Sequence, residues 1–394
     1  MEEYFVQGFK ASAVAAGLKK DGGLDLALIC SEGISVSAGA FTLNQVKAAP
    51  VILSGENIEN GAARAIIANS GNANACSGKE GLEKARRTAL LVARELHIPP
   101  DEVLVASTGV IGAPPDMDRI SGAISSLVRE LSPQGIPRAS QAIMTTDSFP
   151  KMSRFEGEAG GIPYRIVGMA KGAGMIMPNM ATMLCFLLTD IKIDLQHLRK
   201  AISSGVRKTF NRISVDGDTS TNDMVLALAN GAAENGPLSP GDFEVFEEGM
   251  TSVMNELATM IVRDGEGATK LVLVRVAGAA SEKDALTAVR TIANSSLVKT
   301  AFYGQDPNWG RIMAALGRSD IHMKEEDVSI WIDDVQIVEG GLGKGAEAER
   351  EAANKMGKKA FTLTVDLHQG GFEDRMMTCD LTHDYVSINA NYRT

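Results

Sequence analysis

Along the chain, segments with continuous runs of hydrophobic residues alternate with segments in which hydrophobic residues return every three or four positions. Apolar runs typical of strands lie at Leu24–Ile29, Ile34–Ser37, Val103–Ser107, Tyr164–Val167 and Thr269–Val276. Elsewhere apolar residues return every three or four positions, which predicts helices at Gly81–Leu96, Met117–Leu131, Leu195–Thr209 and Asp242–Val262. The alternation predicts a mixed α/β or α+β fold.

The chain from about Ser281 onward predicts a smaller unit with its own alternation. Helices are expected at Glu282–Ala293 and 345–356, and strands at 327–334, 361–367 and 377–390. One layered sheet could hold all of these elements. We therefore expect residues 281–394 to form a C-terminal α+β domain.

Composition and charge exclude several classes of protein. The 394 residues suffice for two or three compact units, and 44% hydrophobic with 22% charged residues is typical of a soluble globular protein. The formal charge of -10 and the lack of a Lys and Arg cluster argue against nucleic acid as a partner. Because no apolar run approaches about 18 residues, and acids stand where a secretory signal carries bases, we expect a cytoplasmic protein without a membrane span.

The residues that most often bind metals show no ligand-like spacing. The four cysteines are far apart, and the five histidines are scattered. Neither a zinc site nor a paired redox motif is indicated, so we expect no bound metal. The stretch GGLGKGAEAE lacks the spacing of a P-loop, and no G-x-G-x-x-G follows a strand, which argues against ATPase and dinucleotide-binding functions.

Several loops are unusually rich in small and polar residues. They read ANSGNANACSG (68–78), VASTGVIG (105–112), IMTTDSFPK (143–151), SVDGDTSTND (214–223), VRDGEGATK (262–270) and FYGQDPNWGRI (302–312). Each alone is typical of an ordinary turn. Six in one chain favour a polar pocket.

Thr182 stands at the start of an apolar run, Met183–Leu188, after the glycine- and methionine-rich stretch KGAGMIMPNMA. A threonine hydroxyl is a weak nucleophile that needs a base, and one solution is the α-amine of an N-terminal threonine. That amine has a pKa of about 8, close to the working pH. A cut directly before Thr182 would create it, and the small residues before the junction permit such a cut without requiring it.

The run KGAGMIMPNMATML resembles the signature of the ornithine acetyltransferase family, the ArgJ glutamate N-acetyltransferases. The similarity extends along nearly the whole chain in family order, through FTLNQVKAAPV, ANSGNANACSG, VASTGVIG, IMTTDSFPK, SVDGDTSTND, RDGEGATK, YGQDPNWGRI and YVSINANYRT. So many ordered matches make the resemblance specific.

The resemblance implies a fold and a processing event. Family members cut themselves before the threonine of M-A-T-M-L, here between Ala181 and Thr182. Residues 1–181 would form an α chain and 182–394 a β chain, in which 182–280 completes the nucleophile domain. The implied fold has αββα layers like the N-terminal-nucleophile hydrolases but a distinct connectivity, and the implied assembly is α2β2.

The resemblance also implies an activity. Members move the acetyl group of N-acetylornithine to glutamate in the cyclic route of arginine synthesis, without a cofactor. Some members also take acetyl-CoA as a co-substrate. We expect a ping-pong mechanism through an acetyl ester of Thr182, with the new α-amine as the base.

Site residues follow from the resemblance position by position. Thr182 is the nucleophile, and Thr108 with Gly109 form the oxyanion hole. The substrate contacts are Thr145, Lys171, Thr182, Glu266, Asn389 and Thr394. Thr146 could replace Thr145, because adjacent identical residues do not fix the alignment. We assign Lys171 to the substrate carboxylate and Glu266 to the side-chain ammonium.

Two other functions stay open. An amidase or aminopeptidase could use the same N-terminal threonine with water as the acceptor, and would release ornithine without glutamate. A binding protein could keep the fold without cutting itself, and would run as a single band near 41.7 kDa on a denaturing gel.

Overall fold

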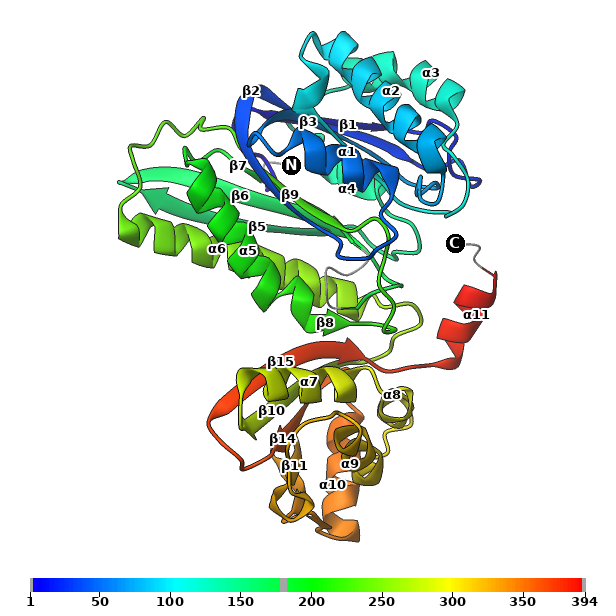
Figure 1. The fold of residues 1–394 in the computed structure, drawn as a ribbon, viewed down its shortest axis with the longest axis vertical. Coiled ribbons are helices and arrows are strands. Elements are labelled where there is room, and N and C mark those ends of the chain that lie inside the picture. Colours follow the sequence, from blue (N-terminus) through cyan, green and yellow to red (C-terminus); the bar gives the residue numbers. More distant parts are fainter. Residues whose placement is uncertain (1–2, 178–182, 392–394) are drawn as a thin grey trace. The chain divides into compact units, whose positions relative to one another are not determined.

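The computed structural model describes residues 3–177 and 183–391, which belong to two compact units (Figure 1). The first unit takes its described residues from Met1–Asn211 and Asp218–Ile261, and the second takes its own from Arg212–Gly217 and Val262–Tyr392. The second unit therefore begins earlier than the expected boundary at residue 281, because the strand just before that boundary belongs to its sheet.

An eight-stranded sheet forms the centre of the first unit. Its strands are β1 (Phe9–Val14), β2 (Leu26–Phe41), β3 (Ala62–Asn69), β4 (Val103–Ser107), β5 (Lys151–Ala159), β6 (Ile162–Lys171), β7 (Leu184–Thr189) and β9 (Met224–Ala229). Their order is β4-β3-β2-β9-β7-β6-β5, with β1 also paired to β2. The pairs β3–β4 and β7–β9 are parallel and the others antiparallel.

The long strand β2 replaces two strands that were expected at Leu24–Ile29 and Ile34–Ser37. Its register with β3 shifts between Cys30 and Ser35, where residues 32–34 are exposed. Those exposed residues mark a bulge within one strand rather than a turn between two. The first half of β2 pairs with β1 and β3 and the second half pairs with β9, so one strand carries both halves of the sheet.

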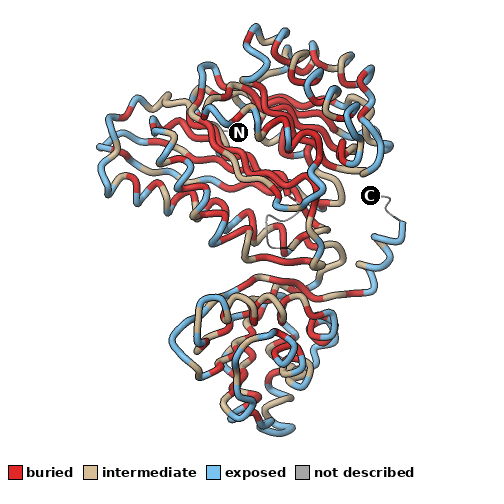
Figure 2. Tube along the Cα trace, viewed as in Figure 1, coloured by how far each residue is buried: buried red, intermediate tan, exposed pale blue. Residues whose placement is uncertain are grey.

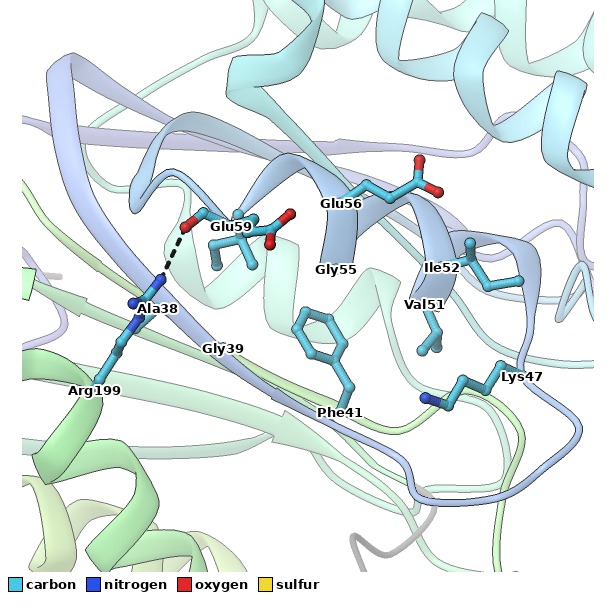
Figure 3. Close-up of a pocket in the computed structure, with 11 residues that line it drawn as sticks. Ala38, Gly39, Phe41, Lys47, Val51, Ile52, Gly55, Glu56, Glu59 and Arg199 are labelled. Atoms are coloured by element: carbon cyan, nitrogen blue, oxygen red, sulfur yellow. Dashed lines mark hydrogen bonds between the residues drawn. The ribbon is translucent and has the colours of Figure 1, made fainter.

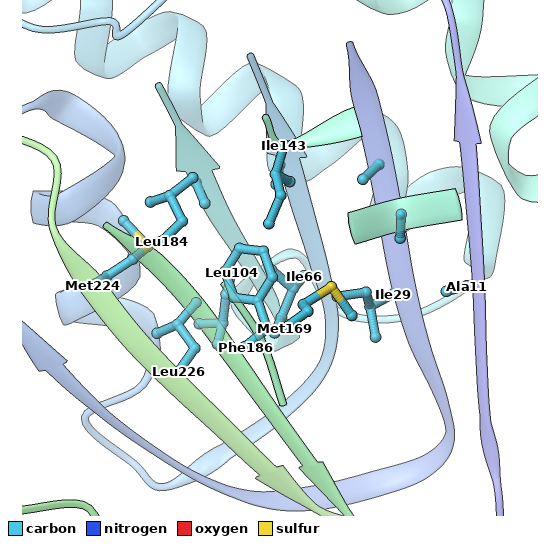
Figure 4. Packing of buried hydrophobic residues seen from close by; sticks show 14 of the residues in the cluster. Ala11, Ile29, Ile66, Leu104, Ile143, Met169, Leu184, Phe186, Met224 and Leu226 are labelled. Atoms are coloured by element: carbon cyan, nitrogen blue, oxygen red, sulfur yellow. The ribbon is translucent and has the colours of Figure 1, made fainter. Parts of the chain in front are cut away.

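The two halves of this sheet pack face to face. Along β3, Ile67 belongs to a cluster with α2 (Gly78–Leu96) and α3 (Met117–Arg129), whereas its neighbour Ile66 lies in a second cluster. That second cluster also holds Met169 of β6 and Phe186 of β7 (Figure 4). Because successive strand residues point to opposite faces, the second cluster is the layer between the two sheet halves.

Helices cover both outer faces. On the far side of β6, a Cβ added at Gly168 would lie 2.6 Å from Val253 of α6 (Pro240–Arg263), and the rings of Tyr164 and Phe246 have centroids 6.0 Å apart. The remaining helices of this unit are α1 (Ala49–Asn57), α4 (Ile136–Ala142) and α5 (Leu195–Lys208). The expected αββα layering is confirmed, and the inner strands are largely buried (Figure 2).

The second unit contains a seven-stranded sheet in the order β13-β12-β11-β14-β10-β15-β8. Its strands are β8 (Ile213–Ser214), β10 (Leu271–Ala279), β11 (Ser329–Ile332), β12 (Val335–Glu339), β13 (Leu342–Gly343), β14 (Ala360–Asp366) and β15 (Phe372–Cys379). Its helices are α7 (Glu282–Ala293), α8 (Ser296–Tyr303), α9 (Trp309–Gly317), α10 (Ala346–Met356) and α11 (His383–Asn391). Residues of α7 pack on β10 in one apolar core.

One expected strand was wrong. Residues 377–390 were expected to be extended throughout, but β15 ends at Cys379 and α11 follows. The Thr382 hydroxyl accepts the Tyr385 N–H at 3.4 Å, and Asp384 lies in the first turn, both of which favour a helix start. Within the described ranges, no helix of either unit has the length and hydropathy needed to cross a membrane.

Candidate active site

The end of β6 and the starts of β7 and β9 lie side by side at one end of these neighbouring strands. Lys171, the last residue of β6, pairs with Leu184 at the start of β7, and Leu184 pairs with Met224 at the start of β9. Met183 and Asp223 directly precede these two strand starts. The predicted nucleophile Thr182 is bonded to Met183, but Ala181, Thr182 and Thr394 lie outside the described residues.

Thr108 and Gly109 follow the end of β4, as the sequence predicted. Gly109 has a φ of +132°, and a Cβ there would lie 2.4 Å from the backbone of Gly71, so only glycine fits this turn. In the described part of the chain no residue accepts a hydrogen bond from the Gly109 N–H. This N–H is therefore available to a ligand.

A buried asparagine ties the Thr108 turn to the edge of the other sheet half. The Nδ2 of Asn222, next to β9, donates to the Ser107 carbonyl at 2.8 Å and to the Ala73 carbonyl at 2.6 Å. Three of the polar loops found in the sequence, 68–78, 105–112 and 214–223, therefore meet at this point. These contacts join the loops, and the polar pocket that their composition favoured stays a prediction.

Lys171 reaches the Thr108 hydroxyl. Its Nζ donates to Thr108 Oγ1 at 3.3 Å, and the two residues are only 3% and 6% exposed. An ammonium group beside a hydroxyl donor favours negative charge on a bound group. The assignment of Lys171 to a substrate carboxylate stays a prediction.

Asp147 is a buried carboxyl whose pKa is affected by the charge of Lys171. Burial alone would raise the pKa of this carboxyl, but the charges of Lys171 and Lys151, with the Gly172 N–H, outweigh burial and lower the pKa to about 2. Asp147 Oδ2 accepts the Thr145 N–H at 2.9 Å. The alternatives Thr145 and Thr146 are both half-buried, and this bond gives no reason to prefer either as a substrate contact.

Asp223 is a second buried carboxyl, but its pKa shifts in the opposite direction. Its Oδ1 accepts the Met183 N–H at 2.9 Å, and the Met183 carbonyl accepts the Met224 N–H at 3.1 Å. Complete burial raises the pKa of Asp223 well above its usual value, against the opposing effect of the Met183 N–H. The peptide that follows Thr182 is thus held by an acid that burial favours in its neutral form.

The second unit brings its own two predicted contacts together. The Nδ2 of Asn389, on α11, donates to Glu266 Oε2 at 2.7 Å. Thr382, just before α11, donates its hydroxyl to the Gly267 carbonyl at 2.7 Å, which holds the helix start beside the Glu266 loop. In contrast, Asn308 of the loop 302–312 caps α9 by accepting the Arg311 N–H, so its polar character has a structural cause.

A groove of about 500 Å³ lies elsewhere in the first unit, between β2, α1 and Arg199 of α5 (Figure 3). Phe41, Lys47 and Glu56 line it, and Arg199 donates to the Glu59 carbonyl at its rim. No predicted site residue belongs to this lining. Among the described residues, no group of three His, Cys, Asp or Glu side chains could hold a metal ion.

Sequence reasoning missed Asp147, Asn222 and Asp223 as parts of this arrangement. All three lie in polar loops that the sequence had singled out: Asn222 and Asp223 in the loop directly before the apolar run of β9, and Asp147 in the TTD block of the loop 143–151. The loops were a usable signal, but they gave no reason to choose among their many Asn, Asp, Ser and Thr residues.

Comparisons with known proteins cover nearly the whole chain. The model of the ArgJ family matches residues 10–394. The arginine biosynthesis bifunctional protein ArgJ of Geobacter sulfurreducens is 51% identical over 394 residues, covering 99% of this chain and 100% of that relative. The glutamate N-acetyltransferase of Methanocaldococcus jannaschii is 48% identical over 400 residues, covering 98% and 97% of the two chains.

A solved structure is also similar. The crystal structure of the arginine biosynthesis bifunctional protein ArgJ from Bacillus halodurans matches with 44% identity and a TM-score of 0.50, covering 52% of this chain and 98% of that chain. The family model and the relatives extend over nearly the entire sequence, including β6, β7, β9 and the loops at the ends of these strands that carry the candidate site. The chain therefore belongs to the ArgJ family.

Proposed function

We propose that this protein transfers the acetyl group of N-acetylornithine to glutamate in arginine biosynthesis, through an acetyl ester of Thr182. The names of the relatives from G. sulfurreducens and M. jannaschii support the pathway and the acetyl transfer to glutamate. The observation that carries the proposal is the Lys171–Thr108 contact, at the edge where β7 begins one residue after Met183.

The chemistry begins with a cut between Ala181 and Thr182, which frees the Thr182 amine. The Thr182 hydroxyl then attacks the acetyl carbonyl of N-acetylornithine while the amine takes its proton. The carbon–nitrogen bond breaks, the amine returns the proton to the leaving nitrogen, and ornithine departs. Glutamate then attacks the ester with its own amine, and N-acetylglutamate leaves with the Thr182 hydroxyl restored.

Each half of this cycle passes through a tetrahedral oxyanion. The Thr108 hydroxyl and the Gly109 N–H are the two donors proposed for it, and Lys171 adds a positive charge behind the hydroxyl. Burial makes these interactions stronger than they would be in water. One donor of this kind typically contributes about 3 kcal/mol to transition-state stabilisation.

Steady-state kinetics and mass spectrometry test the proposal together. Initial rates at varied N-acetylornithine and glutamate should give parallel double-reciprocal lines, and N-acetylornithine alone should add one acetyl group to the fragment that begins at Thr182. Intersecting lines without a trapped acetyl group would indicate direct transfer in a ternary complex. Continued ornithine release without glutamate, beyond the single turnover that acetylates Thr182, would instead indicate an amidase.

Two finer features belong to the same proposal. The bifunctional relative and the glutamate N-acetyltransferase are 51% and 48% identical to this chain, so identity does not separate the two subtypes. Glutamate acetylation with acetyl-CoA as the donor tests for the bifunctional subtype. The α2β2 assembly that the resemblance implied is tested by native mass spectrometry of the purified protein.

A further inference from the structure

Asp147 is a buried carboxylate to which the proposed chemistry gives no role. Its side chain is fully buried. Oδ1 accepts the Lys151 Nζ and the Gly172 N–H, each at 2.6 Å, and Oδ2 accepts the Thr145 N–H at 2.9 Å. A single side chain thus joins the loop before β5 to the end of β6.

Both of the segments that Asp147 joins carry predicted substrate contacts. Thr145 donates its own N–H to the carboxylate, and Lys171 directly precedes the Gly172 that donates the other N–H. Gly172 has a φ of +149°, a backbone conformation that favours glycine, so the chain turns away from the strand at this residue. The bond to Asp147 holds that turn and with it the start of the Lys171 side chain.

A purely structural ion pair would not need these contacts. Asp147 and Lys151 could neutralise each other through one carboxylate oxygen, and the antiparallel ladder already fixes β5 against β6, with Lys151 opposite Ala170. The additional N–H bonds therefore do not hold the strands together. They fix the backbone at Thr145 and Gly172, where the two predicted substrate contacts begin.

The charge of Asp147 also helps to position Lys171. A buried carboxylate is stable only when charges and donors compensate for its lost hydration, and here Lys171 and Lys151 supply the charges. Lys171 is thereby attracted toward Asp147, and its Nζ donates to Thr108 Oγ1 at 3.3 Å. The charge of Asp147 and the hydroxyl of the proposed oxyanion donor therefore both act on the Lys171 ammonium.

We propose that Asp147 is a positioning residue of the acyl-transfer site, which sets the Lys171 ammonium against the Thr108 hydroxyl through its bonds to Gly172 and Thr145. The inference rests on the proposed acetyl transfer. Asp147 itself touches neither the nucleophile nor the substrate in this scheme, and its effect on the rate passes through Lys171. Since a displacement of about 1 Å can cost about 100-fold in rate, loss of this fixation should be visible in kcat.

The test compares Asp147→Asn, Asp147→Glu and Lys151→Met with the wild type. Asparagine keeps the shape but loses the charge and one acceptor, and glutamate keeps the charge but moves it by one methylene. Lys151→Met is the matched control, because it disrupts the same buried ion pair but leaves the acceptors for Gly172 and Thr145. We measure kcat and KM for N-acetylornithine and glutamate, the fraction of cut chain, and the thermal unfolding midpoint.

We expect both Asp147 variants to lose about 10- to 100-fold in kcat, with KM changed less, at temperatures where they remain folded. Lys151→Met should lower the unfolding midpoint but keep kcat within about threefold of the wild type. If Asp147→Asn does not fold, Asp147→Glu alone decides. An unchanged kcat in Asp147→Glu, or an equal loss in Lys151→Met, overturns the inference, whereas a wild type that transfers no acetyl group overturns the proposed function first.

Discussion

Replacing Thr108 by alanine tests the oxyanion hole most directly. The Thr108 hydroxyl accepts a hydrogen bond from Lys171, so its own hydrogen remains available to a bound oxyanion. Alanine removes this donor and also leaves the Lys171 ammonium without that acceptor. Loss of one such donor corresponds to about 100-fold in kcat, or about 2.7 kcal/mol of transition-state stabilisation. Because the hole acts on charge that develops only in the transition state, KM should change much less than kcat.

The assay has to separate catalysis from processing. Intact-mass measurement first gives the fraction of chain cut before Thr182, and initial rates of ornithine formation are then normalised to that fraction. Thr108→Ser keeps the hydroxyl and should lose no more than about tenfold, whereas Thr108→Val keeps the shape without the donor and should behave like Thr108→Ala. A normalised kcat of Thr108→Ala within threefold of the wild type would remove Thr108 from the site, and so would equal losses in the serine and alanine variants.

The remaining predictions concern processing, specificity and pH. Thr182→Ala should leave a single chain of 41.7 kDa, whereas the wild type should give two fragments that meet at the Ala181–Thr182 bond; cleavage that survives in the variant contradicts the mechanism. Glu266→Gln should raise KM for N-acetylornithine by about tenfold and KM for glutamate much less, since only the former has a side-chain ammonium for Glu266 to bind; equal increases would refute our assignment. The folded-state pKa of Asp223 is raised above its unfolded value of about 3.9, so the folded state keeps this proton to higher pH and the wild type loses stability as pH rises from there. Asp223→Asn does not titrate, so its unfolding midpoint relative to the wild type should increase between pH 4 and pH 8, and a constant difference across that range would argue against the raised pKa.

Elements with one polar and one apolar face were predicted well, and the reason is physical. The helices α2 and α7 each show apolar residues at helical spacing because solvent covers their other face, and the predicted α7 agrees with Glu282–Ala293 at both ends. The strand β9 is buried along its whole length and shows no alternation, so its sequence MVLALA gave no prediction. For α11, the β-branched residues of YVSINA favoured a strand, and the local capping by Thr382 outweighed that preference.

The site was predicted unevenly for a related reason. Family motifs located Thr108, Gly109 and Lys171, and the structure adds that Thr108 and Lys171 are in contact. The ionised Asp147 and the raised pKa of Asp223 could not be read from the sequence, because each depends on burial and on neighbours from distant segments. An Asp two residues after a Thr, or one directly before an apolar run, is compatible with an ordinary exposed loop.

The strand order of the first sheet determines what a cut before Thr182 would do to the molecule. β7 and β9 would belong to the second fragment, yet they lie side by side between β2 and β6, which would belong to the first. A cut there would expose no new sheet edge, so the fragments would stay joined through two full ladders of backbone hydrogen bonds. Before the cut, folding is a first-order process of a single chain. After the cut, refolding would require the two fragments to associate, at a rate that depends on their concentration. The cut protein would then stay folded because it unfolds slowly, not because it refolds readily.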